Sequence, residues 1–263
     1  MHSQLVVLGG GPGGYSAAFI AADLGMQVTL VEAEKRLGGT CLLKGCIPSK
    51  ALLHVARVIA EVDELRADWG IEYDTPRIAV ERVRARKEKV IKTLSTGLKK
   101  LAKARKVNLI NARGVFENST TLRLRGDDDS VPADGLLTFD HAILATGSLP
   151  VMPPAFDIGS DRVIDSSGAL ELVDIPETML VIGGGYIGLE MGTVYAQLGT
   201  QVSVVEMLDG LLIGADRDLV KPLKRRLDAL FDKRIFLNTK VGSLADVGGA
   251  VEVAFEGPGK FGT

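Results

Sequence analysis

A glycine-rich segment occurs twice in this sequence, and no other feature constrains the fold as strongly. Residues 5–32 align without gaps on residues 179–206 at a constant offset of 174 positions, with 12 identities in 28 positions. Each copy reads as an apolar strand, a glycine turn, a helix rich in small residues, and a second strand that ends on an acid. Two such copies predict two βαβ units, and therefore an α/β fold with two Rossmann-like domains.

The first copy carries the pattern expected of a dinucleotide site. Gly9, Gly11 and Gly14 lie between the strand and the helix, and Glu32 ends the second strand. The first glycine permits a tight turn, the second lets the backbone approach a pyrophosphate, and the third lets helix and strand pack closely. The helix N-terminus attracts phosphates, and Glu32 is placed to accept hydrogen bonds from a ribose. The alternative is a glycine-rich turn without a ligand.

The second copy repeats this spacing with Gly183, Gly185, Gly188 and Glu206. An acid at this position repels a 2′-phosphate, so we expect the second site to prefer NAD(H) over NADP(H). Two dinucleotide sites in one chain indicate electron passage between cofactors, because a tightly held flavin and an exchangeable nicotinamide can share a hydride.

The two cysteines of the chain, Cys41 and Cys46, follow shortly after the first copy. Four intervening residues can close a small disulfide-bonded loop, and Pro48 suits the first turn of a helix that begins near Cys46. A helix N-terminus stabilises a thiolate, which makes Cys46 a candidate electron-relay thiolate. Cys41, on the preceding loop, would then exchange with substrate. The alternative is a pair of buried structural thiols.

The bulk composition narrows the class of protein. A net charge of −2 and a pI near 6.0 give no general attraction to nucleic acid or to anionic membranes. No stretch approaches roughly 18 uninterrupted apolar residues, so we expect a cytoplasmic protein without a signal peptide or membrane span. His54 and His141 lack ligand companions at metal-like spacing, and we predict no metal site.

The proline-rich residues 150–154 break both periodicities and favour an interdomain linker. We therefore predict a first domain at residues 1–149, with a small antiparallel insertion, and a second at residues 150–263. Helices are expected over residues 48–105 and 216–230. Strands outside the repeat are expected at residues 107–110, 121–125, 136–144, 235–237 and 251–255. The second domain has too few strands for a complete sheet, and we expect it to be incomplete at its C-terminus.

Residues 38–50 read GGTCLLKGCIPSK, and this stretch closely resembles the redox-active segment of dihydrolipoamide dehydrogenases. Those enzymes belong to the flavoprotein pyridine-nucleotide disulfide oxidoreductases, which also include glutathione and mercuric reductases. The resemblance covers essentially the whole chain, including ATG at residues 145–147 and VIGGGYIGLE at residues 181–190. Ser49 and Lys50 are similar to the dihydrolipoamide dehydrogenases, since glutathione reductases typically carry two lysines there. Leu42, Leu43 and Lys44 depart from the Asn-Val pair common in the loop, and we expect little mechanistic effect.

The resemblance implies a role for each matching residue. Cys46 would lie against the flavin ring and Cys41 would be the interchange thiol, while Lys50 would lie beside the flavin's reactive nitrogen and pair with Glu190. Backbone contacts to FAD are implied for Gly39, Thr40, Gly114, Ala145, Thr146 and Gly147. Val241 would contact the adenine side of NAD. Tyr186 resembles a tyrosine that covers the nicotinamide pocket, and simple packing of the turn is an equal alternative.

By the same resemblance, the full-length enzyme is a homodimer that oxidises a dihydrolipoyl group. The group is carried by the acyltransferase of a 2-oxo-acid dehydrogenase complex or by the glycine cleavage carrier protein. Substrate attack on a Cys41–Cys46 disulfide would send electrons through Cys46 and FAD to NAD⁺. The family takes its catalytic base and its dimerisation domain from residues beyond this sequence, so we expect the chain alone to be inactive. A glutathione- or mercuric-reductase-like enzyme and a non-catalytic flavin-binding module remain alternatives.

Residues 77–106 hold 12 basic and two acidic residues, with apolar residues at helical spacing. This pattern predicts an amphipathic helix pair with a solvated basic face. Nucleic-acid binding by this face is disfavoured, and docking of an acidic partner is the more favoured of the two.

Overall fold

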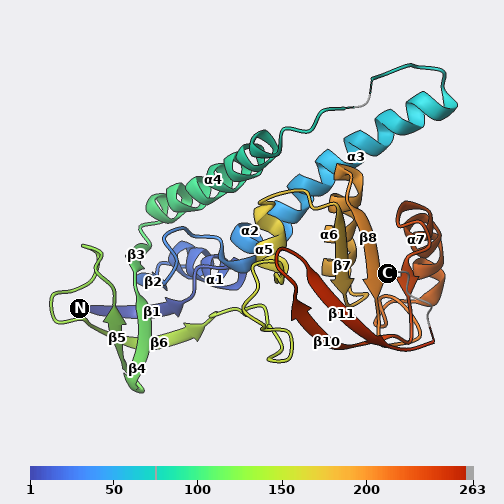
Figure 1. The fold of residues 1–263 in the computed structure, drawn as a ribbon. Helices are drawn as coiled ribbons and strands as arrows, with labels where there is room; N and C mark the ends of the chain where they lie inside the picture. The colour runs from blue at the N-terminus through green and yellow to red at the C-terminus, as the bar shows by residue number, and fades with distance from the viewer. Residues whose placement is uncertain (75, 259–263) are drawn as a thin grey trace. The chain divides into compact units, whose positions relative to one another are not determined.

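The computed structural model describes residues 1–74 and 76–258 and shows the expected mixture of helices and strands (Figure 1). The chain forms two compact units. One contains Met1–Pro48 and Lys87–Leu149, and the other contains Ser49–Arg86 and Pro150–Thr263. The domain limits expected from the sequence stay a prediction. None of the described helices is both long and apolar enough to cross a membrane.

The first unit is built on a six-stranded sheet in the order β3-β2-β1-β6-β5-β4. Its strands are β1 (His2–Leu8), β2 (Val28–Glu32), β3 (Asn108–Asn111), β4 (Arg113–Asn118), β5 (Thr121–Arg125) and β6 (Leu136–Leu144). The first four in spatial order run parallel, whereas β5 and β4 run antiparallel. The sheet therefore has a parallel half, formed largely by the first sequence copy, and an antiparallel half.

Helices cover the parallel half of this sheet. The helices that contribute residues to the first unit are α1 (Pro12–Asp23), α2 (Gly39–Lys44), the first residues of α3 (Cys46–Asp68) and most of α4 (Val80–Ala104). Val7 of β1 packs in one buried cluster with Ala18 of α1 and Ala102 of α4, whereas the adjacent Val6 belongs to a second cluster with Leu122 and Leu137. Successive residues of a strand point to opposite faces, so β1 is buried on both sides.

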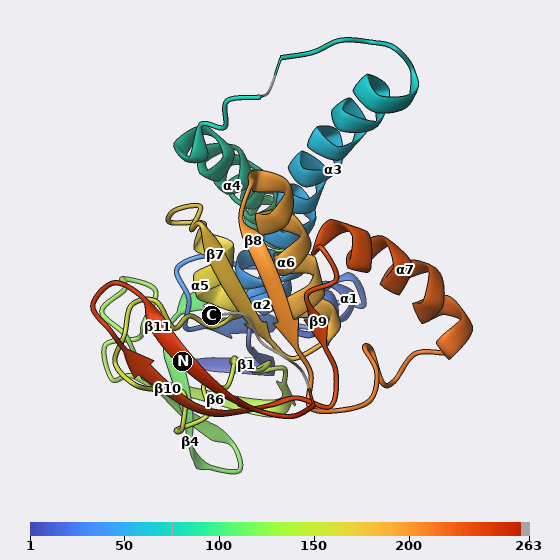
Figure 2. The ribbon, with the colours of Figure 1, turned by 45° about the vertical axis from the view of Figure 1, so that its right-hand side comes forward.

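The second unit contains a three-stranded parallel sheet in the order β7-β8-β9, which Figure 2 shows side by side. Its strands are β7 (Thr178–Ile182), β8 (Gln201–Val205) and β9 (Ile235–Phe236), with a separate antiparallel hairpin of β10 (Lys240–Asp246) and β11 (Val251–Glu256). Its helices are the body of α3 together with α5 (Ser166–Glu171), α6 (Tyr186–Leu198) and α7 (Arg217–Leu230).

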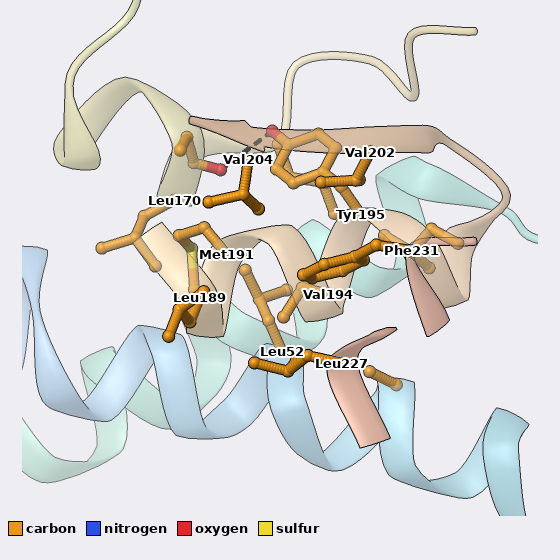
Figure 3. Packing of buried hydrophobic residues seen from close by; sticks show 14 of the residues in the cluster. Leu52, Leu170, Leu189, Met191, Val194, Tyr195, Val202, Val204, Leu227 and Phe231 are labelled. Carbon is orange, nitrogen blue, oxygen red and sulfur yellow. Dashed lines mark hydrogen bonds between the residues drawn. The ribbon is translucent and has the colours of Figure 1, made fainter. Parts of the chain in front are cut away.

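Helix α6 lies at the centre of the second unit's core. Val194 and Tyr195 of α6 pack with Val204 of β8, Phe231 after α7 and Leu52 of α3 (Figure 3). The Tyr195 hydroxyl donates a hydrogen bond to the Ala169 carbonyl oxygen at 3.0 Å, which satisfies the only polar group of this buried side chain. Apolar packing and one hydrogen bond therefore fix α6 against α5 and the sheet.

The two sequence copies fold into the same unit of structure. Leu5 pairs with Val28 in the first sheet, and Met179 pairs with Val202 in the second, so the strand register is conserved at the offset of 174. The prediction of two Rossmann-like βαβ units is confirmed. The sequence analysis missed β4, β10 and α5, because the strands carry interior glycines and polar residues and the helix is shorter than two turns. Cys41, expected on a loop, lies in the short helix α2.

Candidate functional site

The first glycine turn connects β1 to α1, and its backbone geometry requires glycine. Gly9 has φ +110°, and a Cβ atom there would lie 2.1 Å from the Ala145 carbonyl oxygen. A Cβ atom on Gly14 would lie 1.7 Å from the carbonyl oxygen of Gly9. The Gly9 amide donates to the Val31 carbonyl at 2.8 Å, which ties the turn to the end of β2. The first and third glycines are therefore needed for the turn itself.

Glu32 holds the turn from the end of β2. One carboxylate oxygen accepts the Gly10 amide at 2.6 Å, and the other accepts the Glu34 amide at 2.8 Å. The side chain of Asn111 donates to the carbonyl oxygens of Glu32 and Glu34 at 2.9 and 2.7 Å. Each carboxylate oxygen keeps a lone pair, so Glu32 can hold the turn and still accept a ribose hydroxyl.

The N-terminus of α1 fits a pyrophosphate group. Gly11 caps the helix without a side-chain hydrogen bond, and no acidic residue lies in the first turn. The backbone at Gly39 lies close to this helix start, since a Cβ atom on Gly39 would be 2.4 Å from the Cα of Gly11. Main-chain N–H groups at a helix start, together with the helix dipole, attract an anion. Main-chain atoms rather than side chains therefore surround the start of α1, which is the arrangement that a bound phosphate requires.

The remaining residues expected around FAD converge on the same edge of the first sheet. Ala145 follows β6, and its amide donates to the Leu8 carbonyl at the end of β1. A Cβ atom on Gly114 would lie 2.7 Å from the Leu8 side chain. The Thr40 hydroxyl donates to the Ser148 carbonyl at 3.1 Å, which joins α2 to the segment after β6. This edge carries the carboxyl ends of parallel strands, where α/β sheets bind ligands.

The cysteine pair lies at the junction of α2 and α3, within the part of these helices that belongs to the first unit. Cys41 is half-buried in α2, and Cys46 is exposed as the first residue of α3, as the sequence predicts for a helix start near that position. Lys44, between the cysteines, bonds Glu34 at 2.7 Å. The Glu34 amide in turn donates a hydrogen bond to the Glu32 carboxylate, so this ion pair connects the end of α2 to the residue that supports the first glycine turn. The sequence analysis assigned Lys44 little effect and missed this contact.

Lys50 and Glu190 form an ion pair within the second unit. The Lys50 Nζ atom lies 2.6 Å from Oε1 and 2.9 Å from Oε2 of Glu190. The two side chains are 140 positions apart in sequence, on α3 and α6, and Glu190 is the less exposed of the two. The pair expected from the resemblance is present, and its role beside a flavin stays a prediction.

The second glycine turn repeats the first in a more open setting. The amide of Gly183 donates to Val205 at 2.8 Å, and Glu206 accepts the amides of Gly184 and Leu208 at 2.7 and 2.9 Å. Gly185 caps α6, and a Cβ atom on Gly188 would lie 2.8 Å from the Gly183 carbonyl oxygen.

Tyr186 and Val241, the other residues expected at the second site, differ in exposure. Tyr186 begins α6 with 68% of its surface exposed, whereas Val241 is buried in β10. The Thr239 amide donates to the Glu206 carbonyl at 2.9 Å, which brings the start of β10 beside the acid. The roles of Tyr186 and Val241 toward a nucleotide stay predictions.

A leucine lies behind each turn and was missed by the sequence analysis. A Cβ atom on Gly10 would lie 2.7 Å from Leu37, and one on Gly184 would lie 2.5 Å from Leu211. Both leucines are buried, and they are related by the same offset of 174. Extending the repeat alignment by five positions would have found this pair. The two turns therefore share their hydrophobic support as well as their hydrogen bonds.

Comparisons with known proteins agree with this geometry. The sequence pattern of the pyridine nucleotide-disulphide oxidoreductases matches residues 3–261. The dihydrolipoyl dehydrogenase of Vibrio cholerae is 45% identical over 98% of this chain, and that of Haemophilus influenzae is 46% identical over a similar share. The alignments cover 53% and 52% of those proteins, so the chain spans about half the length of these curated relatives.

Solved structures show the same fold. LpdA from Mycobacterium tuberculosis superposes with a TM-score of 0.82 at 27% identity, covering 96% of this chain and 55% of that one. The HOCl-induced flavoprotein disulfide reductase RclA from Escherichia coli, solved as a Cu(II) complex, superposes with a TM-score of 0.78 at 28% identity. That match covers 96% of this chain and 53% of RclA. With two matching glycine turns and a cysteine pair whose second member begins a helix, this chain belongs to the pyridine nucleotide-disulphide oxidoreductase family.

Proposed function

We propose that this chain supplies the flavin site, the redox cysteine pair and the pyridine-nucleotide site of an enzyme that oxidises protein-bound dihydrolipoyl groups and reduces NAD⁺. The observation that carries the proposal is the pairing, in one unit, of the Glu32-supported glycine turn with Cys41 and Cys46. The identity of 45% to a dihydrolipoyl dehydrogenase supports the choice of substrate.

The first unit binds FAD in this proposal. The first turn of α1 would bind the pyrophosphate, Glu32 would accept a hydrogen bond from the adenosine ribose, and residues 145–147 after β6 would contribute backbone contacts. FAD, when bound, supplies two-electron chemistry that connects a dithiol with a nicotinamide. By the family resemblance, Lys50 would donate a hydrogen bond to the flavin, and its own charge is balanced by Glu190 at 2.6 Å.

The cysteine pair carries out the exchange with substrate. A thiolate of the dihydrolipoyl group attacks Sγ of Cys41 in a Cys41–Cys46 disulfide, the S–S bond breaks, and Cys46 leaves as a thiolate. The second substrate sulfur, after losing its proton, displaces Cys41 from the mixed disulfide. The substrate becomes a cyclic disulfide, and the electron pair remains on the two cysteines. The exposure of Cys46 and the half-buried position of Cys41 leave the pair within reach of a carrier arm.

Glu206 sets the choice of nicotinamide cofactor. Its carboxylate is fixed by two backbone amides at the end of β8, so it cannot swing away from an incoming phosphate without losing both hydrogen bonds. A negative charge held there disfavours a 2′-phosphate and favours NAD(H). We propose further that the whole protein is a cytoplasmic homodimer. Its dihydrolipoyl substrate would be carried by a lipoyl-bearing acyltransferase or by the glycine cleavage carrier protein.

Thiol counting on the full-length protein reconstituted with FAD tests the proposal. One equivalent of dihydrolipoamide should reduce the oxidised chain and expose two titratable thiols, Cys41 and Cys46. Cys41→Ser and Cys46→Ser are the matched controls, and neither should gain a pair of thiols. Cys46→Ser should also abolish the long-wavelength absorbance expected of a thiolate beside an oxidised flavin. No change in thiol number in the unsubstituted chain would contradict the proposal.

A second candidate function is that of a different disulfide reductase, and the structural similarity to RclA supports it. Dihydrolipoamide, glutathione disulfide and mercuric ion, offered separately to the full-length protein, distinguish the two functions. Turnover that is fastest with dihydrolipoamide supports the proposal, whereas preference for either of the others replaces it.

A further inference from the structure

A row of lysines runs along one face of α4 within the first unit. Lys89, Lys92, Lys99 and Lys103 recur at helical spacing, and Lys100 lies beside them. Residues three, four and seven apart share a face of an α-helix. At 1.5 Å per residue, the row extends about 20 Å along the helix, and Lys106 continues it past the end. All six of these lysines are exposed. We call them the lysine row.

The opposite face of α4 is fixed against the unit's core. Ile91 and Ala102 are buried, and Leu98 packs against the cluster formed by β1, β2 and α1. Because α4 cannot rotate without exposing these residues, the lysine row is held outward. The row is therefore a fixed feature of the surface.

The lysine row is not neutralised by the chain's own carboxylates. Within the described residues, no member of the row has an ion pair, whereas the nearby Arg105 binds Asp23 at 3.0 Å and Arg36 binds Glu88 at 3.4 Å. Hydrogen bonds from Ser130 account for most of the lowering of the pKa of Asp128, and the charge of Lys99 adds only a small part. Six positive charges on a chain with a net charge of −2 form a strong local field.

A groove accompanies the C-terminal part of the row. It has a volume of about 520 Å³ and is lined by Lys99, Lys100, Lys103 and Lys106 with Val107 and Leu109 beside them. The groove therefore combines four lysine side chains with apolar residues at and just before the edge strand β3. A short extended segment that carries carboxylates and small apolar side chains has the matching chemistry.

We propose that the lysine row is a docking surface for an acidic segment of a partner protein. Its cations are all lysines, which attract carboxylates as mobile point charges, and it contains none of the arginines or aromatic residues that hold phosphates and bases. These features favour a short acidic peptide over nucleic acid. The surface is separate from the redox site, so the inference does not rest on the proposed function.

Fluorescence anisotropy with a labelled decaglutamate peptide tests this docking. The triple variant Lys92→Glu, Lys100→Glu and Lys103→Glu should weaken binding at least about 10-fold in low salt, because attraction becomes repulsion. A matched triple variant, Arg225→Glu, Arg226→Glu and Lys233→Glu, changes exposed cations outside the row by the same formal charge and should weaken binding less than about 2-fold.

Equal weakening in the two triple variants would show that only net charge matters and would overturn the proposal. Decathymidylate binding as tightly as decaglutamate, with the same loss in the row variant, would replace it with a nucleic-acid surface. If the glutamate variant melts at a lower temperature by circular dichroism, the corresponding Lys→Gln variant removes the charge without adding acids. That variant should still lose binding, and retained binding would overturn the proposal.

Discussion

The two glycine turns share their hydrogen bonds but differ in what surrounds them. In both copies the first glycine donates to the end of the second strand, the next glycine donates to the acid, and a leucine packs behind the turn. The first turn lies at β1, which pairs with β2 and β6. The second lies at β7, which among the described residues pairs only with β8.

This difference is visible at the first glycine of each turn. Gly9 and Gly183 have almost the same backbone angle, at φ +110° and +105°. A Cβ atom on Gly9 would strike the Ala145 carbonyl, whereas one on Gly183 would meet nothing within 4 Å. The comparison shows that the fingerprint is formed by one βαβ unit alone, and that the neighbouring strand adds a steric requirement without changing the turn.

The largest expected effect comes from alanine at these two glycines. Gly183→Ala should lower the free energy of unfolding by about 1–2 kcal/mol, because alanine is strained there only by the positive φ angle. Gly9→Ala should lower the free energy of unfolding by about 1–3 kcal/mol more, because its methyl group would also overlap the Ala145 carbonyl. Hydrogen exchange measured by mass spectrometry on peptides from β1 and β7 reads each turn separately. Equal losses of protection would contradict the steric difference between the copies.

A smaller effect is expected at Asn111, whose side chain holds the first turn. Removing its two hydrogen bonds to Glu32 and Glu34 by Asn111→Ala should cost about 1–3 kcal/mol. In the second copy, the backbone amide of Asn238 donates to the Leu208 carbonyl that corresponds to that of Glu34. Asn238→Gly keeps this bond and the φ of +52°, so it should change stability by less than about 0.5 kcal/mol. Urea unfolding of both variants measures the two losses in the free energy of unfolding. Similar losses in the two variants would refute this prediction.

The smallest effect at neutral pH is expected at Tyr195, which corresponds to Ala21 in the first copy. Tyr195→Phe removes the hydrogen bond to the Ala169 carbonyl, and this should lower the free energy of unfolding by about 0.5–1.5 kcal/mol. Burial, with a smaller contribution from Asp174, raises the pKa of Tyr195 to about 12. An unfolded tyrosine titrates near 10, so this residue's contribution to stability is complete below about pH 10 and is lost as the pH rises toward 12.

The phenylalanine variant should therefore lose less stability than the parent chain between about pH 10 and 12. The free energy of unfolding at several pH values across this range provides the measurement. Parallel losses in the two proteins would mean that Tyr195 does not titrate with unfolding.

The sequence could predict the parts of the fold and site that depend on short segments. Gly9, Gly14 and Glu32 act through neighbours within one βαβ unit, and so their spacing alone indicates the turn. Asn111 and Lys44 act through contacts with Glu32 and Glu34 that only the folded chain brings together. Nothing in their local pattern distinguishes them from other polar residues. The strand β4 was missed for a related reason, since its pairing with β5 overrides a polar, glycine-containing sequence.

The carboxylates of Glu32 and Glu206 are already engaged by the backbone before any nucleotide arrives. Each closes its own turn through two amides, so the acid that is proposed to contact a nucleotide is also a structural element of the fold. Redesign of the second site for NADP(H) would accordingly meet a stability cost at position 206 unless the new side chain also accepts those amides. Glutamine, which retains one of the two acceptor oxygens at the same distance from the backbone, should be a better starting point than alanine or a basic residue.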